Sequence, residues 1–253
     1  MKIKEIIDAL ERFAPLPLQE SYDNAGLQVG LTEADVSGAL LCLDVTEDVV
    51  REAVELGCNL IVAHHPLLFR GLKCVSDTSQ VERCVRLAVK NDICIYAAHT
   101  NLDNAEDGVN YKMAEKLGLM DVSPLEGGGV VGYLPTAEDS LAFLQRVKDV
   151  FRVECLEHNE LLSRPIQSVA LCGGAGAFVL DAAIRQEADA FVTGEMGYHQ
   201  FFGHEQQIQI AVTGHYQSEQ YTREIFYQIV SDLAPGLPLF VTNVETNPIR
   251  YLI

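Results

Sequence analysis

From residue 60 to residue 66 the chain reads Leu60-Ile61-Val62-Ala63-His64-His65-Pro66. Its first four residues form an apolar run that is too short for a helix and too continuous for a half-exposed strand. Such a run is typical of a buried parallel strand. Pro66 then makes the chain turn directly after the two histidines. The stretch therefore predicts a parallel sheet with two adjacent imidazoles at the end of one strand.

Apolar runs and helical stripes alternate on both sides of this stretch, and strand, helix and strand return from Ser168 onward. This alternation predicts parallel sheets covered by helices on both faces, an α/β fold. We expect further strands over 39–45 and 93–98, and helices over 3–13, 46–56, 79–90, 108–117 and 137–150.

The second half of the chain repeats the plan of the first. A shift of 130 residues places residues 41–62 on residues 171–192, and a shift of 116 places residues 95–98 on residues 211–214. The first shift pairs Leu41-Cys42 with Leu171-Cys172 and Leu60-Ile61-Val62 with Ala190-Phe191-Val192. The sequence therefore predicts two related three-layer α/β units with mainly parallel sheets.

Both halves end an apolar strand in the pattern His-x-x-x-acid. The pattern runs from His99 to Asp103 in the first half and from His215 to Glu219 in the second. Open α/β sheets bind their ligands at the carboxyl ends of parallel strands. The repeat therefore predicts a site between the halves.

The stretch from Pro124 to Gly132 holds four glycines and is typical of a domain boundary or a crossover. We expect a first α/β domain over 1–125, completed by 235–253, and a second over 126–234. The string Gly127-x-Gly129-x-x-Gly132 matches a dinucleotide fingerprint in letters, but no helix follows it directly, so no dinucleotide cofactor is expected.

Composition limits the partners. The chain has 36 acidic and 18 basic residues, a net charge of −18. So acidic a chain repels nucleic acid, and any anionic substrate needs cations supplied locally, although solvated surfaces alone explain the acid excess. No stretch resembles a signal peptide or a membrane span, and the seven cysteines stand mostly among apolar residues, as reduced core thiols do. We expect a cytoplasmic protein.

The polar residues at the strand ends are candidate metal ligands. Three imidazoles and two carboxylates are too many donors for one tetrahedral ion. Carboxylates can bridge two ions, so two divalent ions per subunit are expected, and Zn, Fe, Mn and Ni all suit this mixture of nitrogen and oxygen donors. Purely structural histidines would predict no metal at all. The proposed ligands are His64, His65, Asp103, His215 and Glu219.

Other residues near these strand ends have candidate roles. Glu195, His99 and His199 could transfer a proton, and His99 could instead orient Asp103. A glycine-rich loop that follows a strand could hold an anion with its backbone N–H groups, or simply form a tight turn. The candidate anion-binding residues are Gly173, Gly174 and Gly176.

Six segments together resemble one known family, the NIF-three-like proteins, often labelled GTP cyclohydrolase I type two. Matches run in order from about residue 20 to the C-terminus. The sequence departs from the family pattern at Tyr22, Asp107 and Gln217-Ser218, none of which is a proposed ligand. Asp107 and Gln217 lie beside the ligands, so these departures bear on substrate preference. The segments that carry the resemblance are Tyr22 to Gly30, His64-His65-Pro66-Leu67, His99-Thr100-Asn101-Leu102-Asp103, Gly173-Gly174-Ala175-Gly176, Thr193-Gly194-Glu195 and Gly214 to Glu219.

The resemblance implies a two-domain α/β subunit, a dinuclear metal site between the domains and a toroidal homohexamer. In that family the metal ligands match the five residues proposed above. Two functions are open. One is a metal-dependent hydrolase that acts on a small, nucleotide-like substrate through a metal-bound hydroxide. The alternative is a non-catalytic metal-binding ring that scaffolds, handles metal or regulates.

Overall fold

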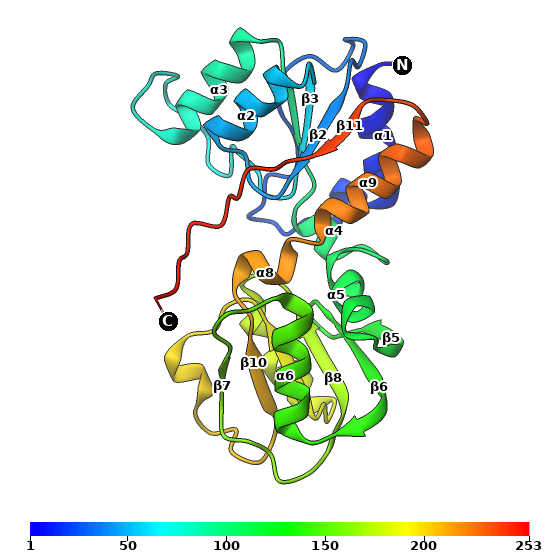
Figure 1. The fold of residues 1–253 in the computed structure, drawn as a ribbon, viewed down its shortest axis with the longest axis vertical. Helices are drawn as coiled ribbons and strands as arrows, with labels where there is room; N and C mark the ends of the chain where they lie inside the picture. Colours follow the sequence, from blue (N-terminus) through cyan, green and yellow to red (C-terminus); the bar gives the residue numbers. More distant parts are fainter. Residues whose placement is uncertain (253) are drawn as a thin grey trace. The chain divides into compact units, whose positions relative to one another are not determined.

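A computed structural model describes residues 1–252 and divides them into two compact units (Figure 1). The first unit combines residues 1–105 with 222–248, and the second contains residues 106–221 and 249–252. These boundaries differ from the predicted ones. The stretch around residue 125 belongs to a hairpin in the second sheet, and the helix over 222–233 packs on the N-terminal helix of the first unit.

The first unit is a five-stranded sheet with helices on both faces (Figure 1). Strand order is β1-β4-β3-β2-β11, in which only β1 runs antiparallel to its neighbour. The strands are β1 (Gly26–Val29), β2 (Ala39–Cys42), β3 (Leu60–Ala63), β4 (Cys94–Ala97) and β11 (Leu239–Val241). The helices are α1 (Ile3–Phe13), η1 (Leu16–Leu18), α2 (Glu47–Glu55), α3 (Gln80–Lys90), α4 (Thr100–Asp103) and α9 (Thr222–Leu233).

Alternate residues of the central strands fill two cores. Leu40 and Ile61 pack with the buried stripes of α2 and α3, whereas α9 packs on β2 and on α1. Each helix on the α2–α3 face begins at a side-chain cap: Thr46 accepts a hydrogen bond from Val49 N, and Ser79 accepts one from Glu82 N. The helices predicted over 3–13, 46–56 and 79–90 are confirmed.

The second unit is a six-stranded mixed sheet with order β5-β6-β8-β9-β10-β7. Strands β8, β9 and β10 are parallel, whereas β5, β6 and β7 pair antiparallel. The strands are β5 (Met120–Pro124), β6 (Val130–Glu138), β7 (Glu157–His158), β8 (Ile166–Cys172), β9 (Ala190–Thr193) and β10 (Gln209–Val212). The helices are α5 (Val109–Leu117), α6 (Ser140–Phe151), η2 (Gly176–Val179), α7 (Leu180–Arg185), η3 (Tyr198–Phe201) and α8 (His215–Glu219).

The predicted α/β class is confirmed, but the second sheet is mixed and not mainly parallel as predicted, and two local predictions were also wrong. The glycine-rich stretch after Pro124 is the turn of the β5–β6 hairpin, and Gly127, Gly128 and Gly129 all have positive φ there. The helix predicted over 137–150 begins at Ser140, because Asp139 caps it by accepting a hydrogen bond from Ala142 N.

Strand register confirms the internal repeat. In the first sheet Leu41 lies opposite Val62, and in the second Leu171 lies opposite Val192, each displaced by 130 residues. The next pair departs by one residue from the predicted shift of 116, since Val62 lies opposite Tyr96 whereas Val192 lies opposite Ala211. The two units therefore share three parallel strands in the same order, and the register of the first two strands repeats residue by residue.

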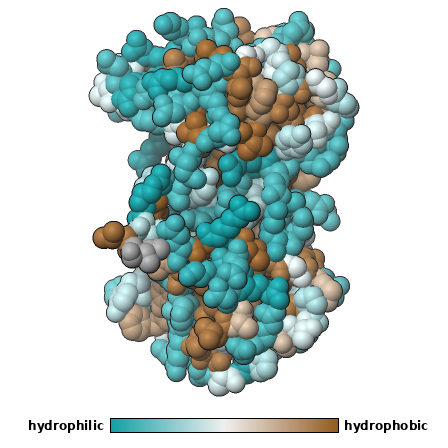
Figure 2. All heavy atoms as spheres, viewed as in Figure 1, coloured by the Kyte–Doolittle hydropathy of each residue, from teal (hydrophilic) through white to brown (hydrophobic). Residues whose placement is uncertain are grey.

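Surface and core agree with the composition. Hydrophilic side chains dominate the face drawn in Figure 2, with apolar ones in separate patches. Five of the seven cysteines are buried as expected, but Cys74 and Cys155 are exposed. No helix within residues 1–252 has the length and apolar character that a membrane span requires.

Helix α6 offers a matched test of the second core. Phe143 is fully buried, whereas Leu141 on the same helix is 65% exposed. We expect Phe143→Ala to lower the free energy of unfolding by about 3–5 kcal/mol, because it leaves a cavity in a packed core. Leu141→Ala should change it by less than about 0.5 kcal/mol. Urea unfolding of the two variants checks this, and equal effects would contradict the described packing.

Candidate metal centre

Polar residues of the first unit gather where three parallel strands end. Asp44 follows β2, His64 and His65 follow β3, and His99 follows β4. The chain turns after β3 as predicted, and the backbone N–H groups of both His64 and His65 donate to the Leu43 carbonyl. Parallel pairing of β2, β3 and β4 thus carries these side chains to one edge of the sheet.

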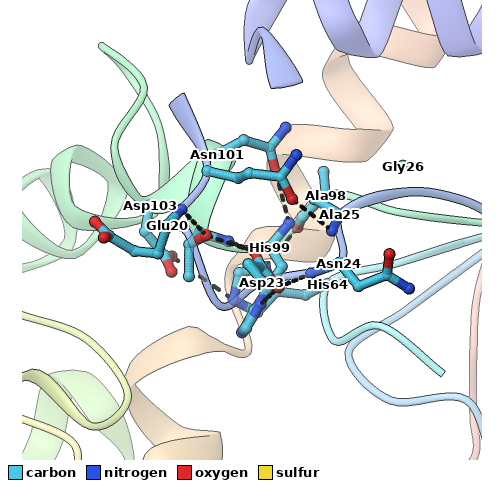
Figure 3. Close-up of polar contacts among 12 residues, drawn as sticks. Glu20, Asp23, Asn24, Ala25, Gly26, His64, Ala98, His99, Asn101 and Asp103 are labelled. Atoms are coloured by element: carbon cyan, nitrogen blue, oxygen red, sulfur yellow. Dashed lines mark hydrogen bonds and ion pairs between the residues drawn. The ribbon is translucent and has the colours of Figure 1, made fainter. Parts of the chain in front are cut away.

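Each of the three histidines has its Nδ1 atom held by a hydrogen bond, and two of these contacts appear in Figure 3. His64 Nδ1 lies 2.8 Å from the carbonyl oxygen of Ala98. His65 Nδ1 lies 2.7 Å from Asp44 Oδ1, and His99 Nδ1 lies 2.7 Å from Asp23 Oδ1. A carboxylate or carbonyl at Nδ1 fixes the proton there and leaves Nε2 as a lone-pair donor, which is the usual arrangement of metal-binding histidines.

The three rings face one another closely enough to share an ion. One nitrogen from each of His64, His65 and His99 lies within 4.8 Å of those of the other two. Asp103 brings a carboxylate to this group, since its Oδ1 lies 3.7 Å from His64 Nε2. The side chain of His64 is fully buried and that of Asp103 is one-quarter exposed. The cluster therefore presents nitrogen and oxygen donors together.

Two carboxylates behind the histidines stay ionised: the side chain of Asp23 is buried and that of Asp44 is half-buried. Burial opposes the ionisation of Asp23, but hydrogen bonds from His99, Thr100 and Asn24 outweigh it and lower the pKa to about 2. Burial likewise opposes the ionisation of Asp44, yet hydrogen bonds from His65 and Thr246 bring its pKa below the usual value. Both aspartates can therefore hold imidazole N–H groups as full negative charges at neutral pH.

The second unit has its own histidine and carboxylate at a strand end. His215 begins α8 directly after the β10 strand and its turn, and Glu219 lies one helical turn later. His215 Nε2 lies 3.0 Å from Glu219 Oε2, and His215 Nδ1 lies 3.0 Å from Glu195 Oε1. Glu219 is almost fully buried. Glu195 thus holds the ring of His215, as Asp44 holds that of His65.

The glycine-rich loop packs on this pair. Gly174 has φ +55°, and a Cβ atom there would lie 2.2 Å from Glu219 Oε1 and 3.3 Å from His215 Nε2. The N–H groups of Gly173 and Gly174 donate to Asn110 Oδ1 and Ser218 Oγ. Because these donors are used within the protein, the geometry favours the tight-turn alternative over the predicted anion cradle at Gly173, Gly174 and Gly176.

Two of the predicted proton-transfer residues have other surroundings than expected. His99 does not hold Asp103: its Nδ1 contacts Asp23, and its ring joins those of His64 and His65. His199 lies in η3, where its ring packs against Tyr198 and Phe202. Within residues 1–252 no contact joins His199 to Glu195 or His215. The short sequence distance between His199 and Glu195 did not predict a shared site, because the chain enters η3 after Gly197.

Sequence reasoning missed the residues that orient the histidines. Asp44 ends the apolar run after β2, and Asp23 lies in a loop far from His99 in sequence. Thr246, after β11, donates to Asp44 Oδ2 at 2.7 Å. An acid at the end of a buried strand could have marked Asp44, but nothing in the sequence marks Thr246.

The donor set fits a divalent metal ion. Imidazole nitrogens with fixed Nδ1 protons and nearby buried carboxylates are typical of Zn, Fe, Mn and Ni sites, and no thiolate is among them. The second unit adds one imidazole and one carboxylate of the same kind. The residues present therefore include groups that can bind metal, as the sequence predicted.

Asp23 makes stability depend on pH in a defined direction. Its folded pKa of about 2 lies below the ordinary 3.8, so its stabilising effect is complete above about pH 4 and is lost as the pH falls towards 2. We expect Asp23→Asn to lower the free energy of unfolding at pH 6, and the gap from the wild type to shrink between pH 4 and 2. Urea unfolding in the presence of a chelator measures this.

The exposed Asp232 on α9 of the same unit provides the control. Asp232→Asn should leave the free energy of unfolding within about 0.5 kcal/mol of the wild type across this range. A constant gap between Asp23→Asn and the wild type from pH 6 to pH 2 would contradict the described role of Asp23.

Comparisons with known proteins agree with this arrangement. The chain is 36% identical over 228 residues to a Clostridium perfringens protein named GTP cyclohydrolase 1 type 2 homolog, covering 87% of each chain. A Lactococcus lactis protein of the same name is 32% identical over 258 residues, covering 98% of each. These names describe the two relatives.

Solved structures share the fold. A Staphylococcus aureus hypothetical protein superposes with a TM-score of 0.92 at 24% identity, covering 100% of this chain and 99% of that one. A Bacillus cereus protein related to NIF3 gives a TM-score of 0.89, also at 24% identity, with coverage of 100% and 99%. The model of the family DUF34/NIF3 (NGG1p interacting factor 3) matches residues 1–248. With two α/β units, histidine clusters at strand ends and a match along nearly its whole length, this chain belongs to the DUF34/NIF3 family.

Proposed function

We propose that the protein is a dinuclear metal-dependent hydrolase acting on a small, nucleotide-like substrate. The observation that carries this proposal is the hydrogen bond at Nδ1 of every histidine in the two clusters, each to a carboxylate or a carbonyl. Histidines with a merely structural role would not all need their hydrogen bond at the same ring nitrogen, Nδ1. The shared feature places the proton of all four rings on Nδ1, so that each Nε2 can act as a lone-pair donor.

Each unit alone supplies an incomplete set of donors. The first offers two adjacent imidazoles with Asp103, and the second offers His215 with Glu219. We propose that these five groups together would hold two ions. Support comes from the donor chemistry of each unit and from the resemblance to the family, in which the same five positions are ligands.

When bound, two divalent ions would supply Lewis acidity and lower the pKa of water at the site. The chain itself supplies groups that position ligands and handle protons. Asp23 holds the Nδ1 proton of His99, so Nε2 of His99 is the atom that can accept or release a proton beside a substrate. Glu195 holds His215 instead of acting as a free base.

The names of the relatives motivate the substrate class. A purine nucleotide offers an electrophilic ring carbon and phosphoesters, both of which a hydrolase can attack. The excess of carboxylates around the histidines disfavours a phosphate group there unless bound cations offset the charge. Metal content and substrate binding should therefore rise and fall together. The homohexamer and the cytoplasmic location stay predictions.

Metal content is the first measurement. Elemental analysis of protein purified without added metal or chelator should find about two equivalents of transition metal per chain. His64→Ala and Glu219→Ala should each reduce this content, because each removes a proposed ligand. His158→Ala is the matched control, since that histidine is exposed on β7. Full metal content in both ligand variants would contradict the proposed site.

Activity is the second measurement, on the same preparations. The metal-loaded wild type should hydrolyse at least one member of a panel of purine nucleotides (GTP first), phosphoesters and cyclic amides. His99→Gln should keep its metal and lower kcat by about 10²–10⁴-fold, since it removes the proton-transfer group. No turnover by the metal-loaded wild type would contradict the hydrolase and leave a metal-binding scaffold as the function.

A further inference from the structure

The segment from residue 70 to residue 90 carries charge of the opposite sign to the rest of the chain. It holds five lysine or arginine residues and two acidic ones, whereas the whole chain holds 18 basic and 36 acidic residues. This segment covers the loop before α3 and α3 itself. A local cationic surface on so acidic a protein is not explained by solubility, which the acidic residues already provide.

A groove runs along this segment on the outer side of α2 and α3. Its volume is about 610 Å³. On α3 the lining includes Arg83, Arg86, Leu87 and Lys90, which recur at i, i+3, i+4 and i+7 and therefore lie on one helix face. Arg51 of α2 contributes a further cation. The groove thus combines a basic helix face with apolar side chains, and the carboxylates of Glu47 and Asp77 also line it.

The cations of the groove differ in their partners. Arg83 pairs with Glu47 through Nε at 2.9 Å, and Arg51 pairs with Glu47 and Asp48. Within residues 1–252 no carboxylate pairs with Arg86 or with Lys90. These two side chains are exposed and lie one helical turn apart, about 6 Å along the axis. They are the charges that remain available to a partner.

Apolar side chains alternate with these cations. Leu87 is half-buried and packs on the core of the first unit, Val89 is 62% exposed and Val75 is 56% exposed. They are spread along the helix and the preceding loop instead of enclosing one pocket. Such a surface suits a chain segment whose own side chains alternate better than it suits one small ligand.

We propose that this groove, lined by α2, α3 and the loop at residues 75–77, binds an acidic amphipathic helical segment of a partner protein. Carboxylates one turn apart on the partner helix would contact Arg86 and Lys90, and apolar residues between them would cover Leu87 and Val89. The inference is independent of the metal centre, because none of the groove residues is a proposed ligand or orients one.

A synthetic peptide tests the proposal directly. The probe is a fluorescein-labelled helical peptide with Glu residues one turn apart and Leu residues between them on the same face. Fluorescence anisotropy of the full-length protein should show saturable binding that weakens as salt is added. A peptide of the same composition, scrambled so that no face carries both Glu and Leu, should bind about tenfold more weakly. Equal binding of the two peptides would show that net charge alone explains the binding, and would overturn the proposal.

Charge reversal on the protein provides the second arm. Arg86→Glu combined with Lys90→Glu should lower the affinity for the peptide about tenfold or more. Lys4→Glu combined with Arg12→Glu on α1 changes the net charge equally and should stay within about twofold of the wild type. Unchanged affinity in the α3 variant would overturn the proposal. A smaller light-scattering mass of that variant would also overturn it, because the groove would then join copies of this chain.

Discussion

Parallel pairing of β2, β3 and β4 is the constraint on which the rest of the molecule depends. Their register, with Leu41 opposite Val62 and Val62 opposite Tyr96, makes the three strands end at one edge. That edge receives Asp44, His64, His65 and His99 from segments far apart in sequence. Both faces of the sheet are covered by helices, so the strand ends are the place where polar side chains can leave the core without losing hydrogen bonds.

Carboxylates behind His65 and His99 determine which ring nitrogen of these histidines can bind a metal ion. An imidazole alone can place its proton on either nitrogen, but Asp23 and Asp44 fix it on Nδ1 of His99 and His65. Their low pKa values mean that neither contact is lost at neutral pH. The second unit repeats the device with Glu195 and His215. Duplication of the fold thus extends from strand register to the way a histidine is held.

Two local sequence patterns, the glycine-rich loop of the second unit and the basic residues of α3, differ in what determines their neighbours. Gly174 is required because Glu219 lies where its Cβ would be, so the loop serves carboxylate packing. The basic residues of α3 share one helix face because their spacing matches the helical period. The neighbour of Gly174 is therefore decided by tertiary packing, whereas the shared face of α3 follows from spacing along the sequence.

The sequence by itself determined the α/β class, the helices over 3–13 and 79–90, the internal repeat and the histidines at strand ends. Those features depend on hydrophobic periodicity and on residues adjacent in the chain, so local interactions encode them. Only the tertiary structure decided that Asp23 is hydrogen-bonded to His99 and that Thr246 is hydrogen-bonded to Asp44. It also decided that residues 124–132 form the turn of a β-hairpin. The two hydrogen bonds join side chains that are 76 and 202 positions apart in the sequence, and the hairpin depends on strand pairing. A long-range hydrogen bond leaves no periodic signal in the sequence.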